Sequence, residues 1–175
     1  MIRSAEHRVL KNNLMTMSQS IFILKLLGIA TLAVVGLSTS TVKAEDVAEI
    51  TLTADKIQFI YDIKEFTVKA GQKVKLTLVN PMESLTKQPH NILILKKGKK
   101  EVVGLLANMG LADPDFITKK NCIPESEDIL HHSGLVLPGK SETIEFTAPK
   151  EKGDYPYICT FPGHWILMNG VMHVK

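Results

Sequence analysis

Features that would place this 175-residue chain in several large functional classes are missing. Residues 1–44 hold five of the 21 Lys and Arg residues and one of the 18 Asp and Glu residues, so the remainder carries 16 basic and 17 acidic side chains. Because that remainder has no basic excess, we expect no nucleic-acid partner. We find no internal repeat, no low-complexity tract and no boundary of a second domain. No nucleophile and base stand in a catalytic pattern, so the sequence does not predict an enzyme.

An apolar run long enough to cross a membrane is also missing. The run at residues 26–37 is about a dozen residues long, whereas a spanning helix needs about 20. Four basic residues precede it, and small Ala44 follows it just ahead of two acidic residues. This order is typical of a secretory signal. We predict a signal peptide over residues 1–44 and a periplasmic or otherwise exported domain over residues 45–175. An uncleaved N-terminal anchor is the alternative, and it is the only membrane attachment that the sequence indicates.

The exported part has the pattern of a β-protein. Short runs of alternating or continuous apolar residues are separated by turns that contain Gly, Pro or Asn, which predicts strands. The run that begins at His90 is nearly all apolar and indicates a central strand covered on both faces. Residues 101–134 lack this alternation and have the room for a short helix or two. Seven or eight short strands imply an antiparallel sandwich with Greek-key connections. We expect strands at residues 50–53, 66–69, 74–79, 90–95, 142–148, 155–159 and 171–174.

Cysteine is scarce, with only Cys122 and Cys159 in the chain. In an exported protein, two cysteines first suggest a disulfide. The surroundings of Cys159 favour a metal instead, because His164 and Met168 follow it in the spacing C-x-x-x-x-H-x-x-x-M. A thiolate, two imidazoles and a weak thioether are the ligands of an electron-transferring copper site. Pro162-Gly163 would fold the loop so that the three side chains face one point.

A second histidine ligand has to come from another part of the chain. His90 is best placed, because it follows Pro89 at the start of the apolar strand. His173 alternates with two apolar residues of the last strand, so it is expected to face solvent. A surface role is also expected for His131 and His132, which lie in the irregular segment. The predicted metal ligands are therefore His90, Cys159, His164 and Met168.

The string CTFPGHWILMNG at residues 159–170, with Pro-His-Asn at residues 89–91, resembles the cupredoxin family of small blue copper proteins, in particular its azurin-like and auracyanin-type members. The similarity covers roughly residues 46–175. It implies an all-β Greek-key sandwich of seven to eight strands with a long, partly helical middle insertion. It also implies one type 1 copper ion, with His90, Cys159 and His164 around it and Met168 as the long axial ligand.

The resemblance carries further expectations about the neighbours of these ligands. Asn91 and Thr160 match positions that join the two ligand loops by hydrogen bonds. Pro89 stands where azurin has a glycine whose carbonyl is a further axial neighbour. Because proline constrains φ, four ligands are expected here. The disulfide of azurin has no counterpart, which leaves Cys122 as an unpaired thiol.

The function implied is that of an electron carrier, whose copper cycles between Cu(II) and Cu(I) and passes electrons between periplasmic redox partners. Partners such as c-type cytochromes or dehydrogenases would dock on an apolar patch at His164 and Trp165. The alternative for Trp165 is an aromatic packed under the loop. A copper enzyme is disfavoured, because Ile158 and Thr160 flank Cys159 where a histidine would be needed to reach a second copper. A periplasmic copper store or chaperone is the alternative function, although the methionines are not clustered as such proteins have them.

Overall fold

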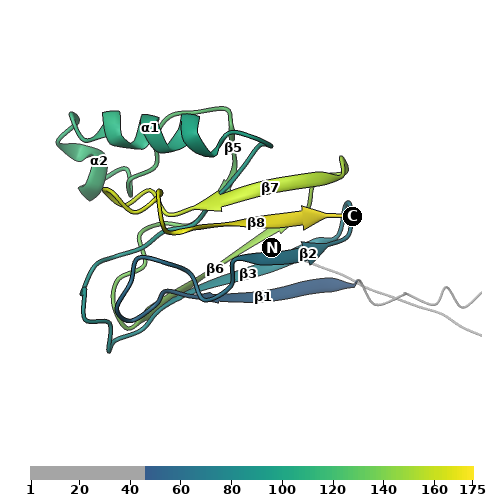
Figure 1. The fold of residues 1–175 in the computed structure, drawn as a ribbon, viewed down its shortest axis with the longest axis horizontal. Coiled ribbons are helices and arrows are strands. Elements are labelled where there is room, and N and C mark those ends of the chain that lie inside the picture. The colour runs from purple at the N-terminus through teal and green to yellow at the C-terminus, as the bar shows by residue number, and fades with distance from the viewer. Residues whose placement is uncertain (1–45) are drawn as a thin grey trace, which may run out of the picture. The chain divides into compact units, whose positions relative to one another are not determined.

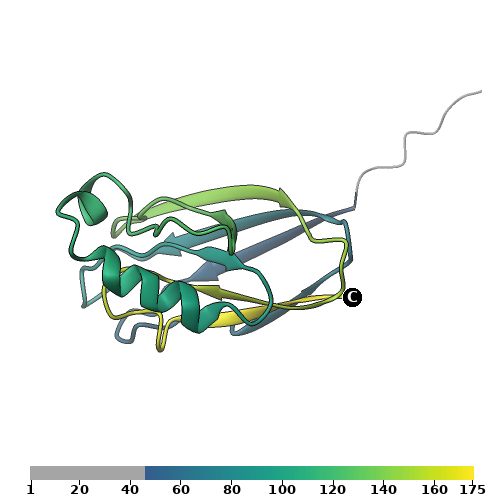
Figure 2. The same ribbon diagram turned by 90° about the horizontal axis from the view of Figure 1, so that it is seen from above.

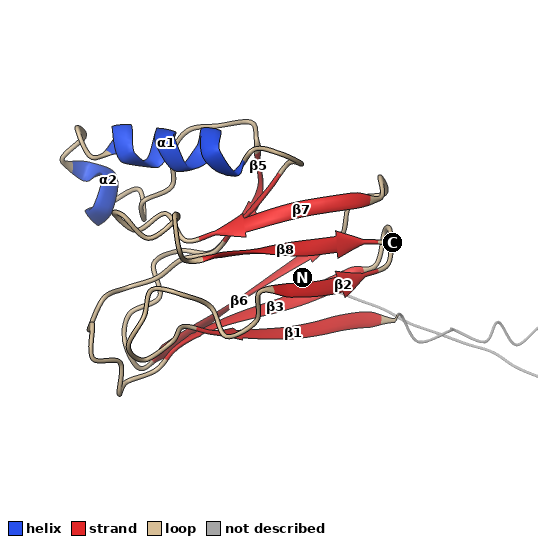
Figure 3. Ribbon diagram, in the orientation of Figure 1, coloured by secondary structure: helices blue, strands red, loops and turns tan. Residues whose placement is uncertain are grey.

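The computed structural model describes residues 46–175, and the predicted signal peptide at residues 1–44 lies outside them. The described residues form two facing β-sheets, with two helices beside one of them (Figure 1, Figure 3). One sheet has the strand order β1-β3-β6, and the other has the order β2-β8-β7-β4-β5. The strands are β1 (Val47–Thr53), β2 (Glu65–Val68), β3 (Lys73–Asn80), β4 (Leu93–Leu95), β5 (Ile129–His132), β6 (Lys140–Thr147), β7 (Gly153–Ile158) and β8 (Asn169–Val174). The all-β sandwich predicted from the sequence is confirmed.

The core lies between the two sheets and follows from the alternation in the strands. In β3, Val74, Leu76 and Leu78 are buried, whereas the alternate residues Lys73 and Lys75 are exposed. An extended strand points successive side chains to opposite faces, so this pattern buries one face and hydrates the other. Tyr61 and Tyr157 lie in the same core, and each hydroxyl donates a hydrogen bond to a backbone carbonyl. Burial of these rings therefore leaves no hydroxyl without a partner.

The all-antiparallel pairing expected from the sequence is wrong for two strand pairs. Strand β1 pairs with β3 in parallel, and β2 pairs with β8 in parallel. Along the chain, β1, β2 and β3 alternate between the two sheets. Two strands that run in the same direction therefore become neighbours in one sheet. Hydrophobic alternation assigns a face to each residue but says nothing about which strand is its neighbour.

The central strand predicted at residues 90–95 is confirmed, but regular pairing begins only at Leu93. Ile92 and Ile94 face the core between the sheets. Leu93 and Leu95 face the other way and pack with Val103 of helix α1 (Lys100–Gly110). The continuous apolar run thus reflects a strand that is covered on both faces, as expected for such runs.

The middle segment contains more structure than the sequence predicts. It holds α1 and the short helix α2 (Asp115–Thr118), as expected, and also strand β5, which the sequence analysis missed. Residues of β5 are only partly buried, so the strand lacks the alternation that identified the others. Seen from above, α1 runs along the sandwich (Figure 2). Within residues 46–175, no helix combines the length and the apolar character needed to cross a bilayer.

Candidate metal centre

The predicted ligands Cys159, His164 and Met168 lie in the loop between β7 and β8. Cys159 directly follows β7, and its backbone N–H donates to the carbonyl of Met168 over 2.9 Å. The N–H of Met168 donates to the carbonyl of His164 over 2.8 Å, which folds the loop back on itself. Gly163 has a φ of +81°, a conformation that L side chains rarely adopt. The local sequence therefore closes the loop and turns its three ligands inward.

The fourth predicted ligand, His90, reaches the same point from the loop between β3 and β4. His90 forms an isolated antiparallel bridge with Val136, with N–H to carbonyl distances of 3.1 and 2.7 Å in the two directions. The side chains of His90, Cys159 and Met168 are fully buried, and that of His164 is 2% exposed. The site therefore excludes water, and two separate loops build it.

The geometry of the three strongest donor atoms fits one metal ion. The Sγ of Cys159 lies 3.9 Å from the Nδ1 of His90 and 3.6 Å from the Nδ1 of His164. A trigonal metal with bonds of about 2.0–2.3 Å would hold such atoms about 3.7 Å apart. All three donor atoms lie within 4.8 Å of one another, and they are the one cluster of this kind among the described residues. With the buried thioether of Met168 beside them, the donor set is that of a blue copper centre.

Burial controls the protonation of these donors before any metal binds. Desolvation lowers the pKa of both His90 and His164 to about 4, and at His90 repulsion from the charged form of His164 lowers the pKa further. Desolvation raises the pKa of the Cys159 thiol to about 12, although backbone hydrogen bonds at Asn91 and Phe161 act in the opposite direction. At neutral pH the two imidazoles are therefore neutral and offer lone pairs, while the thiol has to lose its proton to bind a metal.

The expected link between the two ligand loops is present. The side-chain oxygen of Asn91 accepts the backbone N–H of Thr160 over 2.8 Å, and its amide nitrogen donates to the Thr160 hydroxyl over 2.9 Å. The same nitrogen also lies 2.9 Å from the carbonyl of Asn121, in the middle segment. Asn91 is fully buried, so these bonds satisfy the amide and tie three segments together around Cys159.

The other histidines of residues 46–175 and the second cysteine lie away from the cluster. His131 stacks on Phe146, and neither it nor His132 belongs to the group of donor atoms. His173 projects from β8 and bonds Asp154 at 2.7 Å, while its neighbours Met172 and Val174 are buried, as the alternation predicts. Cys122 is a free, buried thiol, as expected. Both cysteines are free, so the disulfide considered for them does not form in this structure.

Trp165 is partly buried and packs against helix α1, rather than lying in the core under the loop. Its ring lies against Gly104 so closely that no side chain fits between them, and its indole N–H donates to the Asn108 side chain over 3.3 Å. His164 is likewise covered, although the sequence analysis expected its outer edge in a surface patch. The exposed apolar side chains of this loop are Ile166 and Leu167 instead.

Two residues that cover His164 were missed in the sequence analysis. The Phe59 ring stacks on the imidazole, with centroids 4.2 Å apart. The Gln88 side-chain oxygen lies 2.7 Å from the Nε2 of His164. Phe59 comes from the irregular connection between β1 and β2, where the sequence has no hydrophobic periodicity that would indicate a buried position. Gln88 stands two residues before His90, and nothing in the local sequence indicates that it would contact His164.

Comparison with known proteins places these features in a family. The family model described as "Copper binding proteins, plastocyanin/azurin family" matches residues 48–175. Auracyanin-A of Chloroflexus aurantiacus is 36% identical over 120 residues, which cover 67% of this chain and 68% of that protein. Outer membrane protein H.8 of Neisseria gonorrhoeae is 30% identical over 137 residues, or 77% of this chain and 66% of that protein.

The solved structures give the same result. The structure of auracyanin A from Chloroflexus aurantiacus, whose title describes a "blue" copper protein, superposes with a TM-score of 0.64 at 32% identity. The match covers 74% of this chain and 99% of that chain. Both the arrangement of strands and the sequence are therefore shared with a copper protein.

Proposed function

Because the chain belongs to the plastocyanin/azurin family of copper-binding proteins, we propose that it carries single electrons and that His90, Cys159, His164 and Met168 hold its copper. When bound, copper supplies one-electron chemistry by alternating between Cu(II) and Cu(I). The observation that carries the proposal is the buried triangle of one thiol and two imidazole nitrogens, with Sγ to Nδ1 distances of 3.6 and 3.9 Å.

The protein residues contribute a site that resists rearrangement. Cys159 is held by the backbone bond to Met168, and His90 by its bridge to Val136. Asn91 locks the two loops to each other through Thr160. A site that keeps one geometry in both oxidation states needs little reorganisation when an electron arrives or leaves. Hydrogen bonds around the ligands, such as those between Asn91 and Thr160, also tune the reduction potential.

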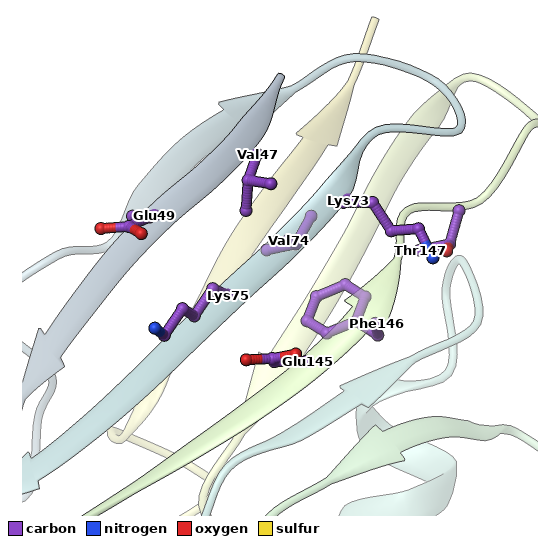
Figure 4. A pocket seen from close by; sticks show the side chains of 8 residues that line it. All are labelled: Val47, Glu49, Lys73, Val74, Lys75, Glu145, Phe146 and Thr147. Carbon is purple, nitrogen blue, oxygen red and sulfur yellow. The ribbon is translucent and has the colours of Figure 1, made fainter. Parts of the chain in front are cut away.

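The shape of the described residues supports a carrier over an enzyme. A hollow of about 650 Å³ lies over β1, β3 and β6, away from the metal-binding residues. Val47, Lys73 and Thr147 line it at the end of these strands remote from Cys159, and Lys75 and Glu145 lie on the same surface (Figure 4). A substrate would have to reach the metal ligands, which are buried beneath their loops.

Electron exchange requires a partner, and we place its docking surface at the end of the sandwich that holds the metal ligands. The loops at this end contact one another, as in the hydrogen bonds from Leu85 to Lys56 and from Gly139 to Asn80. They expose large apolar side chains that a redox protein, such as a c-type cytochrome or a dehydrogenase, would cover. These side chains are Ile57, Met82, Leu85, Leu137, Ile166 and Leu167.

We also propose that the domain works outside the cytoplasm. The proposal rests on the secretory pattern of residues 1–44 and on the similarity to a protein named for the outer membrane. Mass spectrometry of the protein purified from its native host would test it. A chain that begins after Ala44 supports export with cleavage, whereas an intact chain recovered with soluble cytoplasmic proteins would refute export.

The function is tested by adding one equivalent of Cu(II) to the metal-free protein and recording the absorption and EPR spectra before and after ascorbate. We expect an intense thiolate-to-copper band and narrow hyperfine splitting, both lost reversibly on reduction. Cys159→Ser should remove the band while the sandwich stays folded. Cys122→Ser is the matched control, because it removes a thiol outside the cluster and should keep the band. A pale, readily exchanged copper in the unaltered protein would instead favour copper storage.

A further inference from the structure

The outer edge of His164 is closed by side chains rather than open to solvent. The imidazole is only 2% exposed. Phe59 stacks on one face of the ring at an interplanar angle of 20°, and Phe161 packs at a tilt with its centroid 5.0 Å away. Neither phenyl ring can hydrogen-bond the Nε2 of His164. That atom meets the Oε1 of Gln88 at 2.7 Å, a normal hydrogen-bond length.

This contact selects one form of the imidazole. A neutral imidazole carries one proton, on either Nδ1 or Nε2. An amide oxygen is an acceptor only, so a hydrogen bond to it requires the proton on Nε2 of His164. The Nδ1 is then unprotonated and points its lone pair toward Cys159, whose Sγ lies 3.6 Å away. Gln88 thereby leaves free the nitrogen that faces the metal position.

The two imidazoles are held by different means. The Nε2 of His90 is buried and has no hydrogen-bond partner among the described residues. His90 is oriented by its backbone bridge to Val136 and by the packing around it. His164 lies in a turn, and Gln88 is the hydrogen-bond acceptor at its Nε2. A change at position 88 should therefore affect one imidazole and leave the other in place.

Gln88 itself is fixed through its main chain. Its carbonyl accepts a hydrogen bond of 2.9 Å from the side chain of Asn80, at the end of β3. The same Asn80 nitrogen lies 2.9 Å from the carbonyl of Val136, the bridge partner of His90. Pro89, the next residue, has a constrained φ. A substitution of the Gln88 side chain leaves all of these bonds intact, so the variants should fold.

We propose that Gln88 is a positioning residue for His164, and that its amide oxygen both holds the Nε2–H form of the ring and sets how strongly the ring donates to the metal. The inference rests on the proposed copper site. An acceptor at the far nitrogen of a ligating histidine raises the basicity of that ligand. A stronger acceptor should favour the oxidised metal and lower the reduction potential, and a missing acceptor should raise it.

The test uses Gln88→Glu, which keeps an acceptor and adds charge, and Gln88→Leu, which removes the acceptor at similar size. Gln72 supplies matched controls, because it lies in the turn before β3 and its side-chain oxygen accepts a hydrogen bond of 2.8 Å from the backbone N–H of Lys69. Gln72→Glu changes the net charge by the same amount as Gln88→Glu, and Gln72→Leu removes a side-chain amide as Gln88→Leu does. Both control substitutions are far from His164.

The first measurement needs no metal. Long-range ¹⁵N–¹H NMR correlation of the metal-free protein should show the Nε2–H form of His164 in the unaltered protein and in Gln88→Glu. In Gln88→Leu, the Nε2 proton should exchange with water faster. An Nδ1–H form in the unaltered protein would overturn the proposal, whatever the protein does with copper.

The second measurement is the reduction potential of the copper-loaded variants. We expect Gln88→Glu below the unaltered protein and Gln88→Leu above it, with both Gln72 variants unchanged. If the two Gln88 variants shift the potential in the same direction, Gln88 is only a packing residue and the proposal fails. Failure of the proposed function would appear earlier and separately, as a missing blue band in the unaltered protein.

Discussion

The close approach of Trp165 to helix α1 makes Gly104→Ala a sensitive test of how the metal loop is supported. A Cβ at position 104 would lie 2.3–2.7 Å from three ring carbons of Trp165. Non-bonded carbon atoms are normally separated by about 3.5–4.0 Å. The helix or the ring therefore has to move by about 1 Å or more to accommodate the new methyl group. Trp165 follows the ligand His164 directly, and therefore movement of the ring would also disturb the metal loop.

Two opposing effects decide the size of the change in stability. Alanine in a helix interior is favoured over glycine by about 0.8–1.0 kcal/mol. Overpacking of a filled core costs about 1–3 kcal/mol, and an overlap this large belongs in the upper part of that range. We expect the free energy of unfolding to fall by about 1–2 kcal/mol, and thus the urea midpoint to fall by about 0.5–1 M.

The assay is urea unfolding of the metal-free protein, followed by the fluorescence of Trp165, the one tryptophan of the chain. The matched control is Gly110→Ala, whose Cβ would lie 2.5 Å from the ring of Phe116 instead. Both variants should be destabilised, but only Gly104→Ala should change the emission of the folded state. If Gly104→Ala is as stable as the original protein, the packing of Trp165 on α1 is refuted. Without that packing, the higher helix propensity of alanine would leave the free energy of unfolding unchanged or raise it.

Three further predictions concern the metal ligands and one surface histidine. Met168→Gln should keep the blue band and lower the reduction potential measured by voltammetry, because a harder axial oxygen favours Cu(II); an unchanged potential would remove Met168 from the axial role. Metal binding at pH 7 should release about one proton, since the pKa of Cys159 is raised to about 12 and the ligand histidines are already neutral. Indicator titration of the weakly buffered protein measures this, and release of no proton would contradict it. Asp154→Asn should lower the pKa of His173, which the hydrogen bond to Asp154 raises above 6.5. The stability from this pair is present below pH 6.5 and lost as the pH rises through the raised pKa, and an NMR titration with no change in the pKa would contradict the assignment.

Much of the fold and most of the candidate site follow from local patterns. The alternation in β3 and the apolar run of β4 assign buried faces, and the structure agrees with both. Cys159, His164 and Met168 are predicted together because a single short loop contains them. His90 was selected from four candidates by its place at the start of a buried strand. In contrast, β5 was missed, because its half-buried residues do not alternate.

The sequence by itself thus determined the two-sheet architecture, the donor chemistry and the copper family, because these depend on residue type and on spacing over a few residues. Only the tertiary structure decided what surrounds the donors. Gln88 and His164 are 76 positions apart, and they meet because loops from different strands converge at one end of the sandwich. The parallel pairing of β1 with β3 and the packing of Trp165 against α1 arise in the same way. Such contacts depend on which strands become neighbours, and no local period in the chain specifies that choice.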